Sequence, residues 1–222
     1  MGGDVFSPLW VSLSVASLAT GVTFFLGIAS AYAVFRVRNR LAKMVADAVL
    51  TLPLVLPPTV LGFFLLLLFG KRSPLGSALL SFGLPLVFTW WAAVIAAIVV
   101  SLPLMYRTAR GTFEALDRNI IDAARTLGVG EWRIFWHVIL PNARTGILAG
   151  VVLSFARALG EFGATIMFAG NIPGRTQTMS TAIYAAVQAN DYALAFRWAV
   201  VICLMSFVFI GVMNLYLKEG RR

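Results

Sequence analysis

The sequence contains little charge. Asp, Glu, Lys and Arg make up 12% of its 222 residues, whereas 60% of the residues are hydrophobic. Soluble domains carry about 25% charged residues, and the mean hydropathy of +0.88 lies far on the apolar side. The composition therefore excludes an ordinary soluble domain and predicts an all-α integral membrane protein.

Cysteine and histidine are almost absent, with one residue of each. Cys203 has no partner for a disulfide within the chain, and its apolar surroundings in the sequence indicate a small buried hydrophobic residue. His137 has no neighbours at the spacing of a metal site, and one histidine in a loop does not define a Ser-His-Asp set. We therefore expect no catalytic residue and no metal site, which argues against a membrane enzyme.

Two further motifs are missing. No GxxxxGK[ST] loop is present, so the chain is not expected to bind ATP itself. The formal charge of +9 could indicate a nucleic-acid partner, but no basic stripe alternates with aromatic residues and no nucleic-acid-binding motif appears. We therefore expect no nucleic-acid partner, and membrane topology gives a better explanation of the basic excess.

Five apolar runs are long enough to cross about 30 Å of hydrocarbon and to face membrane lipid. They cover residues 9–35, 44–69, 85–106, 145–169 and 194–217. Basic residues follow the first run instead of preceding it, so we expect a retained span and not a cleaved signal peptide. The expected organisation is one membrane domain over residues 1–222, with the shorter segment 179–187 re-entrant or interfacial.

The distribution of positive charge predicts the orientation. With the N-terminus outside, 13 of the 18 lysines and arginines lie in cytoplasmic segments. Three lie outside, Lys71, Arg72 and Arg175, while Arg157 and Arg197 fall within or at the edge of spans. The positive-inside rule favours this orientation, which places the C-terminus and the loop before the fourth span in the cytoplasm.

The second run contains three prolines, Pro53, Pro57 and Pro58, in the sequence LPLVLPPT. Each proline removes a backbone donor and clashes with the preceding turn, so this helix should be kinked or locally unwound. Free carbonyl groups at membrane depth are tolerated only against protein or a water-filled path. We therefore assign Pro57, Pro58 and Thr59 to a translocation path, with a packing kink as the alternative.

The fourth run carries a second polar feature. At about 100° per residue, small and polar side chains fall on one helical stripe: Gly146, Gly150, Ser154, Arg157, Ala158, Glu161 and Thr165. Gly146 and Gly150 form a GxxxG pair that allows another helix to approach closely. Arg157 and Glu161 can pair, and charge at that depth is costly enough to indicate function. Ser154, Arg157, Glu161 and Thr165 are candidate path residues, with a structural ion pair as the alternative.

The longest amphipathic segment joins the third and fourth spans. Within DAARTLGVGEWRIFWHVILP, residues 122–141, a helix is predicted up to Leu127, and a left-handed Gly128 ends it. A second amphipathic stretch leads to Leu140 and Pro141, and proline suits the first turn of a new helix. The sequence predicts a helix, a glycine turn and a helix outside the bilayer. A loop that only joins two spans is the alternative.

This segment resembles the cytoplasmic coupling loop of binding-protein-dependent ABC importer permeases. The family pattern is E-A-A, three residues, G, nine residues and then I-x-L-P. Here it reads Asp122-Ala123-Ala124, Gly128 and Val138-Ile139-Leu140-Pro141, within a coupling loop at residues 118–141. Asp122 replaces the glutamate and Val138 replaces the isoleucine, and both keep charge or shape. The similarity extends from about Leu13 to Leu217.

Two further segments resemble one branch of this family. ARALGEFGA, around Arg157, looks like the permeases for molybdate, tungstate and sulfate, and LPLVLPPTVLG, around Pro57, is most similar to the bacterial molybdate permeases. Molybdate is the first choice of cargo, and sulfate or tungstate are the alternatives. A secondary anion transporter is the alternative from another class, but five spans give no inverted repeat and intramembrane ionisable residues are few.

The resemblance also implies the architecture and the partners. It implies a type I ABC importer transmembrane domain in the cytoplasmic (inner) membrane, with two copies forming a homodimer on two ABC ATPase subunits. ATP and Mg²⁺ would bind to those ATPases and no cofactor to this chain, while a periplasmic or extracellular binding protein delivers the oxyanion. Coupling to the ATPase is assigned to Asp122, Ala123, Ala124, Leu127, Gly128, Leu140 and Pro141.

Overall fold

The computed structural model describes the backbone of residues 6–219 and the side chains of residues 6–211. Within that part of the chain every regular element is a helix, which confirms the expected all-α fold. The elements are α1 (Ser7–Arg36), α2 (Arg40–Val55), α3 (Pro58–Phe69), α4 (Pro74–Ser81), α5 (Trp90–Glu114), α6 (Arg118–Thr126), α7 (Glu131–Ile134), the π-helix η1 (Phe135–Ile139), α8 (Leu140–Asn142), α9 (Arg144–Leu159), α10 (Gly163–Phe168), α11 (Met179–Gln188) and α12 (Tyr192–Glu219).

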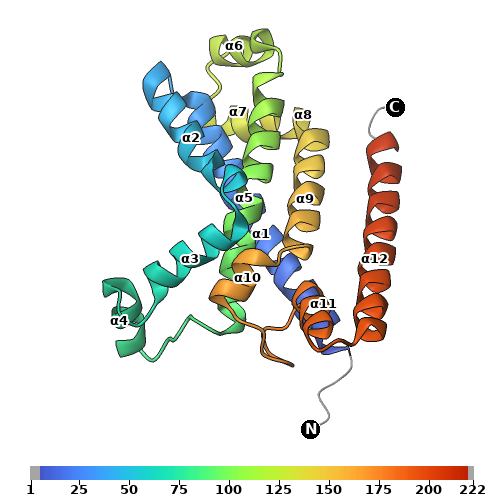
Figure 1. Cartoon of the computed structure of the whole chain (residues 1–222). Coiled ribbons are helices and arrows are strands. Elements are labelled where there is room, and N and C mark those ends of the chain that lie inside the picture. Colours follow the sequence, from blue (N-terminus) through green and yellow to red (C-terminus); the bar gives the residue numbers. More distant parts are fainter. Residues whose placement is uncertain (1–5, 220–222) are drawn as a thin grey trace.

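Three long helices form the centre of the molecule. α5 packs along α1 and α9, and α1 also packs against α9. α2 packs against α5, α10 packs against α3 and α5, and α11 packs against α12. α6, α7 and α8 lie together at one end, whereas α4 and α11 lie toward the opposite end (Figure 1). α12 stands to one side of the central helices and is joined to them mainly through α11 (Figure 1).

The central helices approach closely because small residues line their contacts. Four alanines in the first half of α5 have no exposed surface: Ala92, Ala93, Ala96 and Ala97. They belong to the same buried cluster as Ala16 and Ala19 of α1. Lipid chains are as apolar as leucine, so association of spans depends on packing of this kind.

The GxxxG pair of α9 makes the predicted close contact, and its partner is α5. A Cβ atom at Gly146 would overlap the side chain of Thr112. A Cβ atom at Gly150 would lie 2.9 Å from the sulfur of Met105. Glycine is therefore needed at both positions for this helix packing.

Three helices are long and apolar enough to cross a membrane: α1, α5, and α12 over Tyr192–Gly211. Two bent pairs have that length and composition only when taken together. These are α2 with α3, bent by 111°, and the segment Glu131–Asn142 with α9, bent by 74°. The described residues thus contain three candidate spans, or five if each bent pair counts as one. Arg221 and Arg222, which enter the orientation argument, lie outside the described residues.

The bend between α2 and α3 follows from two adjacent prolines. Pro57 caps α3 and Pro58 is its first residue, while Leu56 has the extended backbone expected before a proline. Pro53 stays inside α2 without ending it. The predicted interruption is present, and the Pro57-Pro58 pair causes it.

The fourth expected span, residues 145–169, is not one continuous helix. α9 ends at Leu159, and α10 begins at Gly163. The connecting sequence LGEFG contains two glycines in four residues, which weakens a continuous helix. The predicted polar stripe therefore stops at Leu159, and Glu161 and Thr165 do not continue it.

Two smaller expectations also need correction. The third span, expected at residues 85–106, starts at Trp90, because the Thr89 side chain caps α5, and it continues to Glu114. Cys203 is exposed and not buried, because α12 stands apart from the central helices.

Candidate functional site

The two ends of α6 are fixed by hydrogen bonds that its sequence supplies. The Asp117 carboxylate accepts a backbone N–H of the first turn at 2.9 Å and caps the helix. Gly128 has a φ of +72°, and its N–H donates to the Arg125 carbonyl at 3.0 Å. The Val129 N–H donates to the Ala124 carbonyl at 3.1 Å. These bonds form the Schellman pattern, and the predicted left-handed glycine turn is confirmed.

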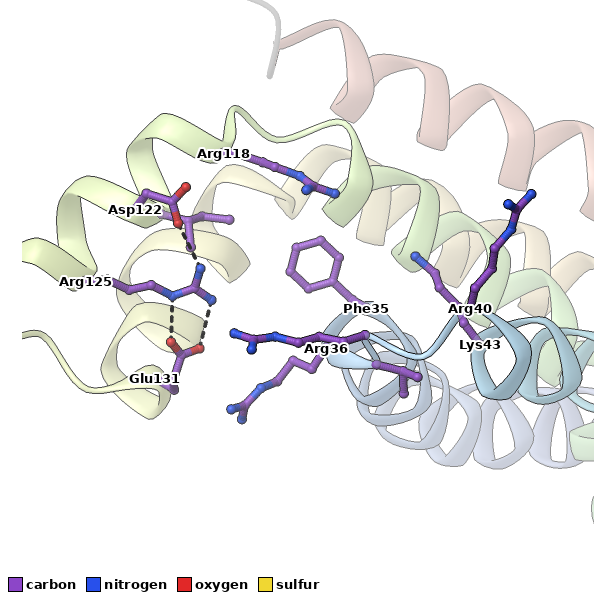
Figure 2. A pocket seen from close by; sticks show the side chains of 11 residues that line it. Phe35, Arg36, Arg40, Lys43, Arg118, Asp122, Arg125 and Glu131 are labelled. Atoms are coloured by element: carbon purple, nitrogen blue, oxygen red, sulfur yellow. Dashed lines mark hydrogen bonds and ion pairs between the residues drawn. The ribbon is translucent and has the colours of Figure 1, made fainter.

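Arg125 joins α6 to α7 across this glycine turn (Figure 2). Its Nη1 donates to Asp122 Oδ1 at 2.9 Å, its Nε to Glu131 Oε1 at 2.7 Å and its Nη2 to Glu131 Oε2 at 3.3 Å. The hydrogen bonds from Arg125 hold the pKa of the Glu131 carboxyl below its usual value. Neither Arg125 nor Glu131 is among the residues predicted from the sequence, although opposite charges on the two sides of a glycine turn are a signal for such a pair.

The helix α6 and the glycine turn that follows it, residues 118–130 and called the α6 turn here, expose large apolar side chains near both ends of the helix. Leu127 is 82% exposed and Ile120 is 51% exposed, whereas Ile121 on the other face is buried. Exposed large apolar residues that lie together indicate an interaction surface. Four predicted coupling residues lie on this turn: Asp122, Ala123, Leu127 and Gly128. Pro141 lies apart from them, exposed in the first turn of α8.

A buried cluster connects the turn to the long helices. The ring of Phe135 in η1 lies 4.4 Å from the ring of Tyr32 in α1 and 6.4 Å from the ring of Phe113 in α5. Ala124 and Leu140, two further predicted coupling residues, are half-buried against the same cluster. The helix α6 is therefore connected to α1 and α5 by continuous close packing of side chains.

Glu161 links the two parts of the interrupted fourth segment. Its side chain is 2% exposed, and its Oε2 lies 2.7 Å from Nη1 of Arg157 in α9. Its Oε1 accepts the N–H of Ala164 in the first turn of α10 at 2.7 Å. The ion pair predicted from the sequence is present. The hydrogen bond to α10 was not predictable from the 100° periodicity, since it exists only because the helix is broken.

The two interrupted segments meet at their breaks. A Cβ atom at Gly163, the first residue of α10, would lie 3.0 Å from Pro58 Cβ and 3.1 Å from the backbone nitrogen of Thr59. Pro57 and Thr59 are exposed beside this contact. The Pro57-Pro58 interruption between α2 and α3 therefore lies next to the break between α9 and α10 that contains Glu161.

Ser154 and Thr165 do not join Arg157 at a common surface. Ser154 is fully buried, and its hydroxyl donates to the Ser101 carbonyl of α5 at 3.4 Å. Thr165 is 1% exposed, whereas the Arg157 side chain is 29% exposed. In this conformation both hydroxyl groups are buried and cannot contact a solute. Packing between helices explains their burial.

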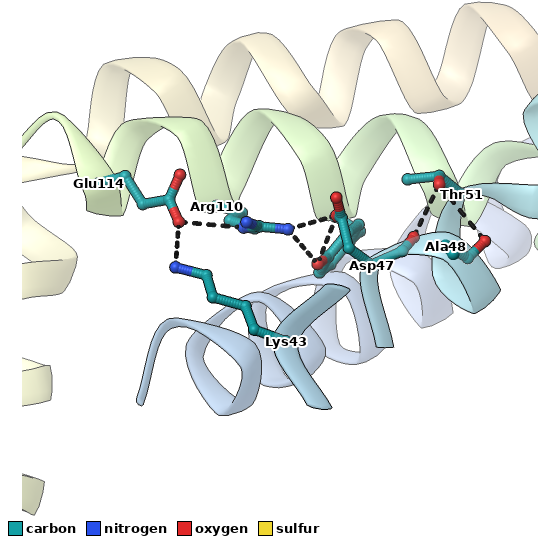
Figure 3. Close-up of polar contacts among 7 residues, drawn as sticks. Lys43, Asp47, Ala48, Thr51, Arg110 and Glu114 are labelled. Atoms are coloured by element: carbon teal, nitrogen blue, oxygen red, sulfur yellow. Dashed lines mark hydrogen bonds and ion pairs between the residues drawn. The ribbon is translucent and has the colours of Figure 1, made fainter. Parts of the chain in front are cut away.

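A second charged network joins α2 to α5 (Figure 3). Arg110 forms ion pairs with Asp47 and, at 3.1 Å, with Glu114. Lys43 Nζ lies 2.7 Å from the same Glu114 oxygen, and the Tyr106 hydroxyl donates to Asp47 at 3.0 Å. Sequence reasoning did not predict this network. The available signal is that Lys43 and Asp47, like Arg110 and Glu114, are four residues apart on their helices.

Comparison with known proteins identifies the class. Residues 23–218 match the family described as "Binding-protein-dependent transport system inner membrane component". The chain belongs to this family. The permease is 46% identical over 208 residues to the putative molybdenum transport system permease protein YvgM of Bacillus subtilis (strain 168), covering 93% of this chain and 91% of that protein.

Other members of the family are also similar to the permease. It is 47% identical to the molybdenum transport system permease protein ModB of Escherichia coli (strain K12), over 82% of this chain and 81% of that protein. It is 36% identical to the sulfate transport system permease protein CysT of the same strain, over 96% and 76% of the two chains.

Solved structures of ABC transporters have the same fold as this permease. The inward-facing MetNI methionine ABC transporter matches with a TM-score of 0.75 and 14% identity, over 97% of this chain and 95% of that chain. A bacterial ABC transporter that imports the acidic polysaccharide alginate matches with a TM-score of 0.79 and 14% identity, over 98% and 80%. The predicted type I ABC importer transmembrane fold is confirmed.

Family membership places the permease in the membrane as a multi-pass translocation subunit. The family's description also implies a binding protein as a partner.

Proposed function

We propose that this permease is the membrane-spanning subunit of an ATP-driven importer that carries molybdate into the cytoplasm. The observation that carries the proposal is the exposed apolar turn of α6, which is closed by Gly128, held to α7 by Arg125 and packed through Phe135 against α1 and α5. Such a turn offers a partner a docking surface with a direct mechanical connection to the spans.

The choice of molybdate is supported by the relatives. Proteins named as molybdenum transport permeases are 40% to 47% identical over most of the chain. Proteins named as sulfate permeases are 36% and 38% identical. Sulfate and tungstate remain the alternative cargoes, since all three oxyanions are tetrahedral and doubly negative.

In the proposed assembly, two copies of the permease form a homodimer on two ABC ATPase subunits. One chain encloses too little space for a path, and a symmetric pair is the commonest closed arrangement. Large exposed apolar residues are available for contacts with the second copy and with lipid: Leu52, Val55, Phe64, Phe196, Leu204 and Phe207. ATP and Mg²⁺ bind to the ATPases, the permease holds no cofactor, and an external binding protein delivers the oxyanion.

The proposed mechanism is alternating access driven by the ATPases. Closure of the ATPases pushes the two α6 turns together, and the aromatic contacts of Phe135 pass this displacement to α1 and α5. Helix α9 packs on α5 through Gly146 and Gly150, so α9 moves together with α5. The contact between α10 and the start of α3 then changes. This change opens and closes the path where the break between α2 and α3 meets the break between α9 and α10.

Arg157 supplies the positive field along this path. A doubly negative oxyanion is repelled by the Glu161 carboxylate, which therefore does not bind it directly. Glu161 instead holds Arg157 and the first turn of α10 in place. Binding at Arg157 stays weak, because a tight site would trap the anion, and selection among oxyanions is left to the external binding protein.

The cargo is tested by ATP hydrolysis in the assembled complex. The permease, its ATPase and the binding protein are reconstituted in proteoliposomes, and the binding protein is supplied empty or loaded with molybdate, tungstate or sulfate. We expect the molybdate-loaded protein to stimulate hydrolysis most. Greater stimulation by sulfate would replace the proposed cargo.

The proposed orientation predicts which loops are accessible from outside the cell. In a chain with Cys203→Ser, the substitution Arg175→Cys should react with an impermeant maleimide added to intact cells. The substitution Gly130→Cys should react only after the cells are permeabilised. Both positions are exposed, and Gly130 has a φ of −65°, which accepts a side chain. The reverse labelling pattern would overturn both the orientation and the coupling assignment.

A further inference from the structure

A basic pocket lies between the α1–α2 connection and the α6 turn. Its volume is about 850 Å³, and eleven residues line it. Six of these residues are cationic: Arg36, Arg38, Arg40, Lys43, Arg118 and Arg125. Figure 2 shows that the labelled cations come from both sides of the pocket, with Arg36 at the end of α1 and Arg118 at the start of α6.

The acidic residues of the pocket leave most of this charge uncompensated. Asp122 and Glu131 are the two carboxylates in the lining, and both pair with Arg125. Lys43 pairs with Glu114. Among the described residues, no ion pair involves the remaining four cations, which are Arg36, Arg38, Arg40 and Arg118. Four guanidinium groups around one pocket repel one another, so an anion bound between them would be stabilised.

The position of the pocket indicates headgroup depth. Arg36 is the last residue of the 30-residue helix α1, so the pocket lies where this span leaves the hydrocarbon. Trp132 and Trp136 follow Glu131 of the pocket lining, and both are exposed, at 71% and 47%. Tryptophan is enriched at the level of the lipid headgroups.

The surroundings and the volume favour an amphiphile over a free oxyanion. The first two turns of α2 carry Arg40 and Lys43 of the pocket lining, and they expose Leu41, Met44 and Val45, which are 64%, 61% and 52% exposed. These side chains offer an apolar surface for acyl chains next to the cationic pocket. A volume of about 850 Å³ falls within the range of about 300–1,000 Å³ for sites of larger organic ligands.

We propose that this pocket binds the phosphate headgroup of an anionic phospholipid from the cytoplasmic leaflet. Arg36, Arg38 and Arg40 contact the phosphate from the α1–α2 side, and Arg118 contacts it from α6. The lipid therefore connects the membrane surface to the start of the α6 turn. Basic pockets between spans on the cytoplasmic side bind anionic headgroups in this way. The inference uses the proposed orientation but does not depend on the cargo.

The test measures lipid binding to the purified permease by native mass spectrometry. The protein is titrated with phosphatidylglycerol or phosphatidylcholine carrying the same acyl chains. We expect phosphatidylglycerol to bind at least about tenfold more tightly. The triple variant Arg36→Gln, Arg38→Gln, Arg118→Gln should lose this preference, and the corresponding lysine variant should keep part of it.

A matched control removes the same charge elsewhere on the cytoplasmic side. Arg107, Arg133 and Arg144 are exposed and do not line the pocket. Replacing these three by glutamine should leave the preference unchanged. An equal loss in both triple variants would mean diffuse surface attraction and would overturn the pocket. Circular dichroism and gel filtration of each variant exclude loss of the preference through misfolding.

Two further arms separate the lipid from other anions. Displacement of phosphatidylglycerol by excess inorganic phosphate would mean a free-anion site and would contradict the lipid assignment. Stoichiometric loss of the lipid when the ATPase subunit binds would mean that the pocket belongs to the protein interface, and would contradict it too. Retention under both conditions is the expected result. None of these measurements requires transport, so their failure is distinct from failure of the proposed function.

Discussion

Replacing Arg157 by alanine is expected to abolish oxyanion uptake by the assembled transporter. The substitution removes the cation beside the meeting point of the two helix breaks and leaves the Glu161 carboxylate, only 2% exposed, without its ion-pair partner. An uncompensated buried carboxylate adds a repulsive field for a doubly negative cargo. The measurement is uptake into proteoliposomes that contain the ATPase and the binding protein, normalised to the amount of assembled complex.

The control is Glu161→Gln, which removes charge and keeps shape. The amide oxygen of glutamine can still accept the Ala164 N–H, so the first turn of α10 should be retained along with part of the uptake. If both variants fail equally and both complexes dissociate on purification, the pair is structural and the path role of Arg157 is wrong. Loss of uptake by Arg157→Ala in an intact complex supports the path role.

Replacing Gly128 by valine is expected to uncouple the permease from its ATPase. At a φ of +72°, a β-branched residue is strained by roughly 1–2 kcal/mol or more. Relief of this strain breaks the hydrogen bonds of Gly128 and Val129 to α6 and displaces the exposed Leu127. Membrane insertion should survive, while co-purification of the ATPase and stimulated ATP hydrolysis should fall strongly.

Gly130→Ala is the matched control for this prediction. Gly130 lies in the same loop with a φ of −65°, and no atom lies within 4 Å of an added Cβ. This variant should bind and stimulate the ATPase like the parent protein. Normal transport by Gly128→Val would show that the glycine is an ordinary loop residue.

Features set by local sequence were predictable. Apolar runs of sufficient length indicated the long helices, because burial in lipid depends on hydropathy and length alone. The Pro57-Pro58 break and the positive φ of Gly128 were also predictable, since proline and glycine restrict or permit the backbone at their own positions.

The break within the fourth apolar run was not predictable in the same way. The fourth run reads as one apolar stretch, yet it breaks between Leu159 and Gly163. Hydropathy does not show that the Glu161 carboxylate can accept an N–H of the first turn of α10 and pair with Arg157 at the same time. For the same reason the stripe predicted from periodicity wrongly extended to Thr165.

The candidate site was predicted in part, for comparable reasons. The left-handed turn at Gly128 followed from the glycine at the end of an amphipathic helix, whereas Asp122 was assigned from its resemblance to the family motif, and its coupling role stays a prediction. The contacts of Arg125 with Glu131, and of Arg110 with Asp47, depend on how separate elements are placed in space. Spacing along the chain gives the charges that are available, but it does not give their partners.

The central claim is that ATP hydrolysis on a partner drives oxyanion import through this permease, and the energy source of uptake tests it most directly. Molybdate and its binding protein are placed on the external face of proteoliposomes that contain the permease and the ATPase, with ATP on the opposite face. Uptake should require both ATP and the binding protein and should persist when ionophores collapse all ion gradients. Uptake that proceeds without ATP and disappears with the ion gradients would identify a secondary transporter and contradict the account.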